Sequence, residues 1–585
     1  MLTRSKYKSV SPADTISKIK FILSLLGIEV QSKIITNDNL NYSCRLQICS
    51  YGLDKFNIGS NGKGMSEDYA LASAYAELLE RLQNKALISG NLRYATRCFL
   101  SYNNYSFSNL PTLDFFYFPD ETERWLTLSE LEHEIIPRYF PLCNCNSLDK
   151  NAQYPCIFAP FKELVTNRTQ MIPVEYYRAM CGTTGLCAGN NREEAIIQGI
   201  NEIFERYVLM KIFTTHLELP QVNLSIFEGH EIYNRIKELE RKYTIVIKDC
   251  SLGIGIPVLG LLLIDQNNGT YAFRLGADFN IITALERCYT ESFQGENAEK
   301  YIFNQYDAEN PIDYKQYKKA LKNGRGRFPH CILDDNLSKP QFPHHDFSSY
   351  KEELHYYINL ISSLGTNLYV KDNSFLGFPA YAVYIPNFSI KREPLFCFSE
   401  MVDKKRLTYG KKDPLLNIIE SFGTDSSEML LKNLEDDVAI LQKWNTSKSA
   451  QINSLILEMY VYVANKDYQQ AKIRIKKLSQ KYNLPVGLRC AYDLLTYLEN
   501  EKDLTIVRKI YGHTMVNTFL EQFLDVKKFI NSQSFPRCFQ CDTCPIIDTC
   551  NFKGILEFER MIQEKQKNHH IYSMFSSQNK KDNEI

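Results

Sequence analysis

The segment Glu77-Leu-Leu-Glu80-Arg81 has a second copy in this sequence, Glu202-Ile-Phe-Glu205-Arg206. A polar side chain stands one helical turn before each copy, Ser73 and Gln198. Residues three and four positions apart share one face of a helix, so the two glutamates of each copy lie on one side, one turn apart. We therefore expect two helices that carry matching polar stripes.

Both stripes lie in segments that carry almost no other charge. From Tyr69 to Leu82 the remaining residues are mostly apolar or small, and the segment from Ala195 to Met210 is similar. A helix that is apolar almost all round is buried, so the carboxylates are expected in the interior. Two such charges about 6 Å apart repel each other by roughly 3 kcal/mol at an effective dielectric near 20. Bound Mg²⁺ with all-oxygen ligands would offset this repulsion, and salt bridges between the two helices are the alternative.

A third stripe and two glycine-rich segments supply groups that a phosphate needs. Arg287, Glu291 and Gln294 keep the same helical spacing. The glycine-rich segments 59–64 and 183–190 are interpreted as turns, each of which leads into a stripe helix. Backbone amides, the helix starts and Lys63 would attract an anion there. A Walker A loop is excluded, because Gly64 stands where Ser or Thr should follow the lysine.

The ordered set of these motifs resembles the YcaO family. The set comprises Gly62-Lys63-Gly64, Glu77-x-x-Glu80-Arg81, Thr184-Gly185-x-x-Ala188-Gly189-Asn190, Glu202-x-x-Glu205-Arg206 and Ala284-Leu-Glu-Arg287. The resemblance covers about residues 1–400 and implies the YcaO fold, in which repeated α/β units surround an ATP site. Some relatives have asparagine where this chain has Thr184, which is a minor departure.

The resemblance also implies roles for single residues. The Mg²⁺ ligands would be Glu77, Glu80, Glu202 and Glu205. The nucleotide or its phosphates would be held by Lys63, Ser73, Gln198, Arg287, Glu291 and Gln294. The arginines Arg81, Arg206 and Arg287 would stabilise the charge on the transferring phosphoryl group. In this family, ATP activates a peptide-bond oxygen by phosphorylation.

The end of the sequence bears on which member of the family this is. Azoline-forming relatives commonly end in a proline-rich tail, whereas this chain has no proline beyond Pro545. Its length and helical carboxyl-terminal part resemble instead the stand-alone YcaO proteins associated with β-methylthiolation of an aspartate in a small-subunit ribosomal protein. That likeness favours an accessory factor with a sulfur-transfer or methylthiotransferase partner. The alternatives are a modification enzyme for a ribosomally made natural product, by azoline cyclodehydration or thioamidation, and a non-catalytic nucleotide-binding scaffold.

The 585 residues are too many for one ordinary core. Expected strands at 42–49, 55–58, 258–264, 271–275 and 380–385 alternate with expected helices at 66–82, 192–212 and 281–293. The segment Ser11-Pro12-Ala13-Asp14 predicts the start of a first helix, and Asn267-Asn268-Gly269 predicts a hairpin between the strands at 258–264 and 271–275. This mixture indicates an α+β body over about residues 1–400, which the resemblance makes the ATP-binding catalytic domain. Helical spacing alone continues over 411–535, as in Ile452, Ile456, Met459 and Val463, and predicts an all-α, TPR-like domain. Residues 536–585 form the last segment, with a polar tail.

That last segment holds four cysteines in the pattern Cys538-x-x-Cys541-x-x-Cys544-Pro545-x-x-x-x-Cys550. Such dense clustering predicts metal binding. The spacing departs from the bacterial ferredoxin run, and an iron–sulfur cluster and tetrahedral zinc both remain open. Disulfides or a redox-sensing set of thiols are the other interpretations.

The composition bears on partners and location. Lysine plus arginine (68) balances aspartate plus glutamate (68), which argues against a protein that binds nucleic acid by bulk charge. The longest early apolar run, Phe21 to Ile28, is too short to cross a membrane. Scattered cysteines in a chain without an export signal indicate reduced thiols and a cytoplasmic location. The expected partner is therefore a peptide or protein substrate, with no nucleic acid and no membrane, and homodimer formation is left open.

Overall fold

The computed structural model describes residues 9–37, 41–56, 58–88, 124–127, 155–215, 217–292, 303–306, 314–324, 326–334, 340, 342, 345, 347–390, 448–480, 483–526, 554–555 and 557–568. The first unit of the chain is a three-stranded antiparallel sheet of β1 (Val30–Asn37), β2 (Asn41–Ile48) and β3 (Gly59–Gly64). It packs with α1 (Pro12–Leu25) and α2 (Glu67–Gln83) around one apolar core. Helix α1 begins as the sequence predicts, with Pro12 in its first turn and the Ser11 side chain accepting from the Asp14 backbone N–H.

A second antiparallel sheet follows later in the chain. Its strands, in spatial order, are β12 (Asn304–Gln305), β11 (Thr270–Ala277), β10 (Val258–Asp265), β9 (Thr244–Asp249) and β8 (Gln221–Val222). The predicted hairpin is confirmed as β10 and β11, joined at Gly269 with φ +60°. Helices α7 (Glu231–Leu239) and α8 (Ile281–Ser292) share an apolar core with the side chains on one face of this sheet.

A third sheet takes strands from both halves of the body. Its order is β4 (Arg124–Thr127), β5 (Pro155–Glu163), β13 (Tyr369–Asp372), β14 (Ala380–Tyr384) and β7 (Leu186–Ala188), with β6 (Thr169–Pro173) paired to β5. Helix α5 (Val174–Cys181) contacts β5 and β6, and α11 (Tyr350–Ser363) contacts α6. Three-stranded, five-stranded and six-stranded sheets with covering helices confirm the mixed α and β body.

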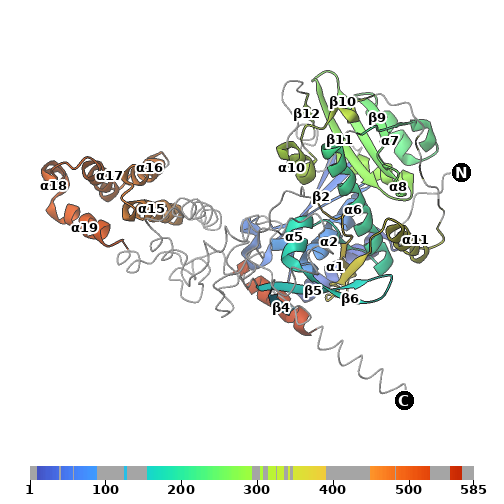
Figure 1. Cartoon of the computed structure of the whole chain (residues 1–585), viewed down its shortest axis with the longest axis horizontal. Coiled ribbons are helices and arrows are strands. Elements are labelled where there is room, and N and C mark those ends of the chain that lie inside the picture. The colour runs from blue at the N-terminus through green and yellow to red at the C-terminus, as the bar shows by residue number, and fades with distance from the viewer. Residues whose placement is uncertain are drawn as a thin grey trace, which may run out of the picture.

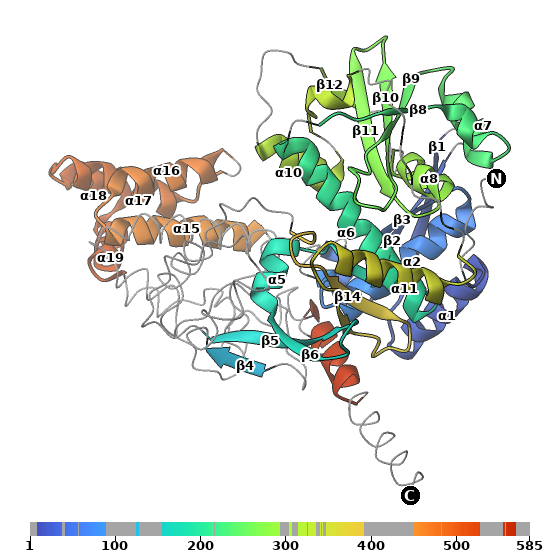
Figure 2. The same ribbon diagram turned by 45° about the vertical axis from the view of Figure 1, so that its right-hand side comes forward.

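Helix α6 (Arg192–Thr214) is the central element of this body. Its first half packs with α11, β13 and β14 in one apolar cluster, and its second half packs with β10, β11 and α10 (Tyr314–Asn323) in another. Figures 1 and 2 show α6 running from the second sheet towards α2 and α11. The prediction of a buried helix is confirmed, since thirteen of its 23 residues are buried.

Two local predictions were wrong. The expected strand at 55–58 coincides with the end of a 3₁₀ helix, Ser50–Phe56. The glycine-rich segment 59–64 is a strand and not a turn, because it pairs with β2 along its whole length. Its glycines bring α2 close: a Cβ on Gly62 would lie 2.0 Å from the Ala70 carbonyl oxygen. Segment 183–190 likewise contains strand β7, although Gly185 in it has φ +83°.

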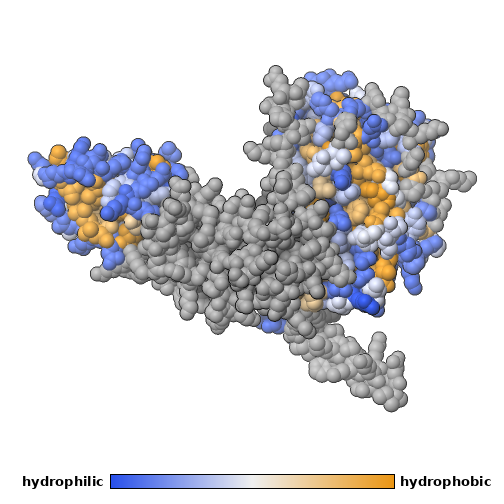
Figure 3. All heavy atoms as spheres, viewed as in Figure 1, coloured by the Kyte–Doolittle hydropathy of each residue, from blue (hydrophilic) through white to orange (hydrophobic). Residues whose placement is uncertain are grey.

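The carboxyl-terminal part is helical, as predicted. Its helices are α15 (Lys448–Ala464), α16 (Tyr468–Ser479), α17 (Val486–Glu499), α18 (Thr505–Tyr511) and α19 (His513–Leu524). Ile506 and Ile510 of α18 are 56% and 65% exposed, and Figure 3 shows hydrophobic residues gathered over α18 and α19. The expected domain boundaries at 400, 411 and 535 lie outside the described residues and stay predictions.

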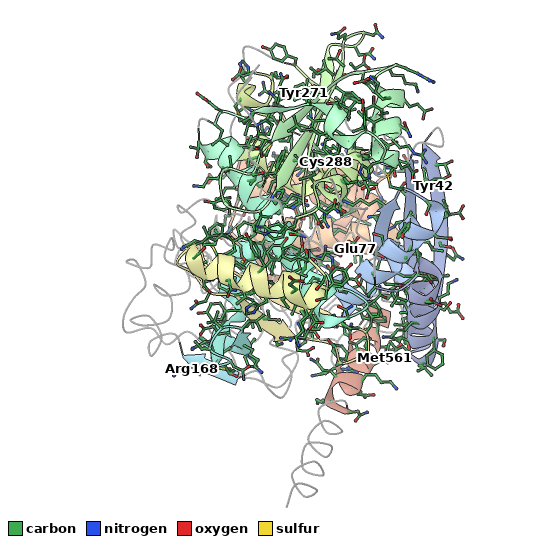
Figure 4. All side chains as sticks on the ribbon, turned by 90° about the vertical axis from the view of Figure 1, so that its right-hand side faces the viewer. Tyr42, Glu77, Arg168, Tyr271, Cys288 and Met561 are labelled. Carbon is green, nitrogen blue, oxygen red and sulfur yellow. The ribbon has the colours of Figure 1, made fainter. Side chains whose placement is uncertain are left out.

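The last described helical segment, 557–568, returns to the first unit. Phe558 and Ile562 join the core of α1 and α2, and the Phe558 ring meets that of Tyr51 edge-on at 5.6 Å. Met561, labelled in Figure 4, packs against the same core. Among the described residues, no helix is both long and apolar enough to cross a bilayer.

Candidate functional site

The two carboxylate stripes lie on α2 and α6, as the sequence predicts. In each stripe the second glutamate is the more buried. The side chains of Glu77 and Glu80 are 35% and 10% exposed, and those of Glu202 and Glu205 are 24% and 4% exposed. Figure 4 shows Glu77 at the centre of the body, below Cys288 of α8.

Each arginine pairs with the glutamates of its own helix. The Arg81 Nε lies 3.6 Å from Glu77 Oε1 and 3.4 Å from Glu80 Oε1. The Arg206 Nε lies 3.9 Å from Glu202 Oε1 and 3.8 Å from Glu205 Oε1. These separations are too long for good hydrogen bonds. Each of these ion pairs lies within one helix. Arg81 and Arg206 therefore do not form the salt bridges between the two helices that were the alternative to bound Mg²⁺.

The two helices nevertheless share one electrostatic environment. Burial raises the pKa of Glu80 well above its usual value; Arg81 lowers it in part, while Glu77 and Glu202 raise it further. Burial lowers the pKa of Arg81, but Glu80, Glu77 and Glu202 together outweigh burial and raise it. Glu202 of α6 contributes to the raised pKa values of both Glu80 and Arg81 of α2. The α2 and α6 stripes therefore lie close to each other.

Helix α8 adds the third stripe. Lys63 of β3 forms an ion pair with Glu291 of α8. Burial raises the pKa of Glu291, but Lys63, Arg206 and Arg287 together lower it to about 2. Burial and Glu291 raise the pKa of Glu205 to about 7, against the opposing effect of Arg206, Arg287 and Lys63. Strand β3 and helices α6 and α8 thus bring three cations and three carboxylates together. The cations are Lys63, Arg206 and Arg287, and the carboxylates are Glu205, Glu291 and Glu202. Glu202 belongs to this set because it contributes to the raised pKa values of Arg206 and Arg287.

Several atoms of this cluster are buried without a hydrogen bond. They are Arg81 Nη1, Glu205 Oε2, Arg206 Nε and Arg287 Nε. An unsatisfied buried polar atom costs about 1–3 kcal/mol, and more when the group is charged. Unsatisfied guanidinium and carboxylate groups side by side fit a ligand that carries both phosphate oxygens and a metal ion.

No three of the Asp, Glu, His and Cys residues that the structure describes converge closely enough to hold a metal alone. The four glutamates are therefore not a preformed cage. Mg²⁺ commonly takes only one or two protein carboxylates and completes its shell with phosphate oxygens and water. The arrangement thus suits a cation that enters together with a nucleotide.

The remaining predicted site residues are placed less fully. Ser73 and Gln198 are half-buried, one turn before Glu77 and Glu202. Gln294 and the cysteines Cys538, Cys541, Cys544 and Cys550 lie outside the described residues. The roles of all of these residues stay predictions.

The loop before α6 contacts the site directly. The Gly185 N–H donates to Glu202 Oε2 at 3.4 Å. The neighbouring Thr184 is fully buried, and its hydroxyl makes no hydrogen bond. A Cβ on Gly185 would lie 2.3 Å from the Val383 carbonyl oxygen, so glycine is needed here for close approach as well as for its φ of +83°.

Sequence reasoning missed a buried polar chain behind Arg287. Tyr357 of α11 donates to Asn201 of α6, and Asn201 Nδ2 donates to Asp278 Oδ2 at 3.4 Å. Asp278 contributes to the raised pKa of Arg287. A sequence signal existed, because Asn201 is the polar residue immediately before the second Glu-x-x-Glu-Arg motif.

Comparison with known proteins identifies the family. The family described as YcaO cyclodehydratase, ATP- and Mg²⁺-binding, matches residues 61–389, which is more than half of the chain. The chain belongs to the YcaO family. The matched segment contains all three stripes and residues 61–64 of the glycine-rich strand that precedes α2.

Two curated relatives match over the same share of the chain. An uncharacterized protein of Haemophilus influenzae is 27% identical over 405 residues, and the ribosomal protein S12 methylthiotransferase accessory factor YcaO of Escherichia coli is 25% identical over 402 residues. Each alignment covers 65% of this chain and 65% of the relative. This chain therefore matches just under two thirds of their length.

Solved structures are also similar. A heterocyclase in complex with substrate and cofactor gives a TM-score of 0.47 at 18% identity, covering 66% of this chain and 54% of that protein. The YcaO protein of Methanopyrus kandleri, bound with AMPPCP and Mg²⁺, gives a TM-score of 0.42 at 15% identity, covering 65% and 92%.

Proposed function

We propose that this YcaO protein binds ATP with Mg²⁺ and uses it to activate a backbone amide oxygen of a peptide or protein by phosphorylation. The buried cluster on α2, α6 and α8 carries this proposal, because it holds unsatisfied guanidinium and carboxylate atoms together. An amide resists substitution since its oxygen is a poor leaving group. In the proposed reaction a nucleophile adds to the carbonyl carbon, the carbonyl oxygen takes the γ-phosphoryl group of ATP with release of ADP, and the C–O bond then breaks as phosphate leaves.

The proposed site residues form two groups that differ in charge. Glu77, Glu80 and Glu202 present carboxylates around Arg81 and are the proposed Mg²⁺ ligands, together with Glu205. Lys63, Arg206 and Arg287 gather around Glu205 and Glu291 and are proposed to hold the phosphates. Fixed cations in a buried site stabilise developing phosphoryl charge more strongly than they would in water. Arg81 is proposed to act at the boundary between the two groups.

The test combines binding and turnover. Calorimetry with ATP should show binding that requires Mg²⁺. Phosphate release should rise when a mixture of unstructured peptides is added, and peptide product should carry a mass change at a backbone position. Tight Mg²⁺-dependent binding without turnover on any peptide would contradict the enzyme and favour the non-catalytic scaffold.

Within the family, we propose the accessory role in β-methylthiolation of an aspartate in a ribosomal protein. The supporting observation is the match to the Escherichia coli accessory factor. The partner would then be a sulfur-transfer or methylthiotransferase enzyme. Mass spectrometry of small-subunit ribosomal proteins from cells with and without this chain tests the role: an unchanged methylthio group would contradict it.

The family description as a cyclodehydratase supports the second candidate, a modification enzyme for a ribosomally made natural product. Incubation with ATP, a sulfide source and a cysteine-containing precursor peptide distinguishes the accessory role from this candidate. Loss of one water per modified residue would establish azoline formation, whereas replacement of oxygen by sulfur would indicate thioamidation.

A further inference from the structure

The turn of α8 that carries Glu291 is held by side chains from two different sheets. Asn41 of β2 donates through Nδ2 to the carbonyl oxygen of Thr290 at 3.0 Å. Arg274 of β11 donates through Nε to the carbonyl oxygen of Glu291 at 3.4 Å. Two consecutive backbone groups of α8 are therefore bound by residues far away in the sequence.

The first sheet contacts this turn at two points. Lys63 of β3 forms its ion pair with the Glu291 side chain, and in the sheet register Lys63 lies opposite Ser43 of β2, two residues beyond Asn41. Asn41 is fully buried, so its hydrogen bond is shielded from water and is electrostatically stronger than one made in water. Neighbouring strands thus bind consecutive residues of α8, one through the backbone and one through the side chain.

The second sheet supplies Arg274, and its guanidinium is itself firmly anchored. Arg274 Nη1 donates to the carbonyl oxygens of Phe273 at 2.8 Å and of Gly324 at 2.6 Å. Gly324 has φ +66°, and a Cβ on it would lie 2.4 Å from Arg274 Cζ, so glycine is needed there to admit the guanidinium. The two short bonds fix the group from which Nε makes its longer bond to Glu291.

These contacts fix the backbone of Glu291 independently of its carboxylate. The side chains of Glu291 and Lys63 are 18% and 26% exposed, whereas Asn41 and Arg274 are buried behind them. A ligand that binds the pair therefore need not displace either buried residue. Because groups about 1 Å out of place can cost about 100-fold in rate, the backbone contacts bear directly on how well the pair meets a ligand.

We propose that Asn41 and Arg274 are positioning residues of the nucleotide site. They hold the backbone of α8 in the one place where Glu291 pairs with Lys63, and this pair then meets the phosphates. The proposal rests on the proposed function for the identity of the ligand. The positioning of Glu291 itself can be measured without a nucleotide.

The first readout is the rate at which acetic anhydride acylates Lys63 in the full chain, measured by mass spectrometry of its peptides. Pairing with Glu291 slows this reaction. Arg274→Met and Asn41→Leu should each raise the rate by about 2- to 5-fold, the change equivalent to an ion pair that is partly exposed to water, and Glu291→Gln should do the same. Arg274→Lys should restore part of the protection, because its ammonium retains donors.

The second readout is the affinity for AMPPCP with Mg²⁺, measured by calorimetry. Arg274→Met should lose at least about 10-fold and Asn41→Leu about 3-fold, since a charged donor contributes more to a hydrogen bond than a neutral one. In a Glu291→Gln background, each substitution should cost less than about 2-fold, because residues that act through Glu291 have nothing left to position. A purely structural role would give the same loss in both backgrounds.

Lys248→Met is the matched control. Lys248 of β9 is a fully buried cation of the same sheet as Arg274, and it donates to the carbonyl oxygen of Asp334. Its loss should leave both the acylation of Lys63 and the affinity for AMPPCP unchanged. Circular dichroism checks that each variant is folded, and Asn41→Leu carries the test if Arg274→Met is not.

Unchanged acylation of Lys63 in both Arg274→Met and Asn41→Leu would overturn the proposal. So would a loss of AMPPCP affinity that is as large in the Glu291→Gln background as in the wild type. If the wild type shows no Mg²⁺-dependent binding of AMPPCP, the proposed function fails, and the acylation rates still decide whether Asn41 and Arg274 position Glu291.

Discussion

Helices α2 and α6 carry the same Glu-x-x-Glu-Arg stripe in different surroundings. On α2, Arg81 lowers the pKa of Glu80, whereas Glu77 and Glu202 raise it. On α6, Glu205 is surrounded by Arg206, Arg287 and Lys63, with Glu291 as the opposing carboxylate. One sequence pattern therefore yields a carboxylate-rich end and a cation-rich end. The difference suggests that the metal and the phosphates meet between the two helices.

The largest expected effect concerns how the helices are brought together. In Gly62→Ala the new Cβ would lie 2.0 Å from the Ala70 carbonyl oxygen of α2, whereas in Gly189→Ala it would lie 2.9 Å from the Ala195 backbone nitrogen of α6. Backbone must move in the first case, so we expect destabilisation of at least about 3 kcal/mol, against about 1–2 kcal/mol in the second. Urea unfolding measures both.

Gly487→Ala is the control for that comparison. Gly487 lies in α17, and its nearest neighbour would be an ordinary contact at 3.6 Å. Alanine is the better helix former by up to about 1 kcal/mol, so this variant should be unchanged or more stable. A similar loss of stability in all three variants would contradict the close-approach account.

The cation-rich end should dominate nucleotide affinity. Arg287→Met leaves Glu205 and Glu291 with less counter-charge and removes a donor for phosphate. Loss of one partner from a buried charge network costs about 3–5 kcal/mol, so we expect at least about a 100-fold loss of AMPPCP affinity. Arg81→Met should cost less affinity. Arg168→Met, on an exposed residue, should cost none.

If Arg81→Met weakened the nucleotide more than Arg287→Met did, the assignment of the two ends would be reversed. Calorimetry in the presence of Mg²⁺ provides both numbers. Stability measured on the same preparations separates lost contacts with the ligand from partial unfolding.

When no ligand is bound, the buried carboxylates of the two stripes should destabilise the folded protein. Burial makes ionised Glu80 and Glu205 unfavourable, and more so for Glu80, where the pKa is raised further. At pH 8, Glu205→Gln should therefore stabilise the nucleotide-free protein by about 1 kcal/mol, and Glu80→Gln should also stabilise it. Both variants should lose the stabilisation that Mg²⁺ with AMPPCP gives the wild type. Thermal unfolding with and without ligand measures both effects. A nucleotide-free Glu80→Gln variant that is less stable than the wild type would contradict the expectation.

The smallest effect is a pH dependence. The pKa of Glu205 is raised in the folded state from 4.5 to about 7, so the folded state holds this proton more tightly than the unfolded state does. Stability without ligand should then fall as the pH rises from about 4.5 through about 7, by a few degrees in Tm. Mg²⁺ with AMPPCP should remove most of that fall. A Tm that rises across this window in wild type and Glu205→Gln alike would contradict the cause.

Much of the fold follows from local sequence. The Ser11-Pro12 helix start, the Asn267-Asn268-Gly269 hairpin and the apolar helix around Glu202 are confirmed because neighbouring residues decide them. Segment 59–64 was misjudged, since glycine is typical of turns and only the packing of α2 against Gly62 explains a glycine-rich strand.

The site was predictable only in part. The repeated spacing gave α2 and α6, but which cation opposes which carboxylate depends on contacts between distant segments. Lys63 and Glu291, for example, are brought together only when β3 and α8 pack. The return of Phe558 to the first unit likewise has no local signal.

The central claim is that carboxylates of α2 and α6 bind one metal–nucleotide complex. Calorimetric titration of AMPPCP into Glu202→Gln, with and without Mg²⁺, tests it most directly, with Glu231→Gln as the control because Glu231 is 61% exposed. We expect Glu202→Gln to lose about 100-fold in affinity and all of its Mg²⁺ dependence, while Glu231→Gln binds as the wild type does. Unchanged Mg²⁺-dependent affinity in Glu202→Gln would contradict the account.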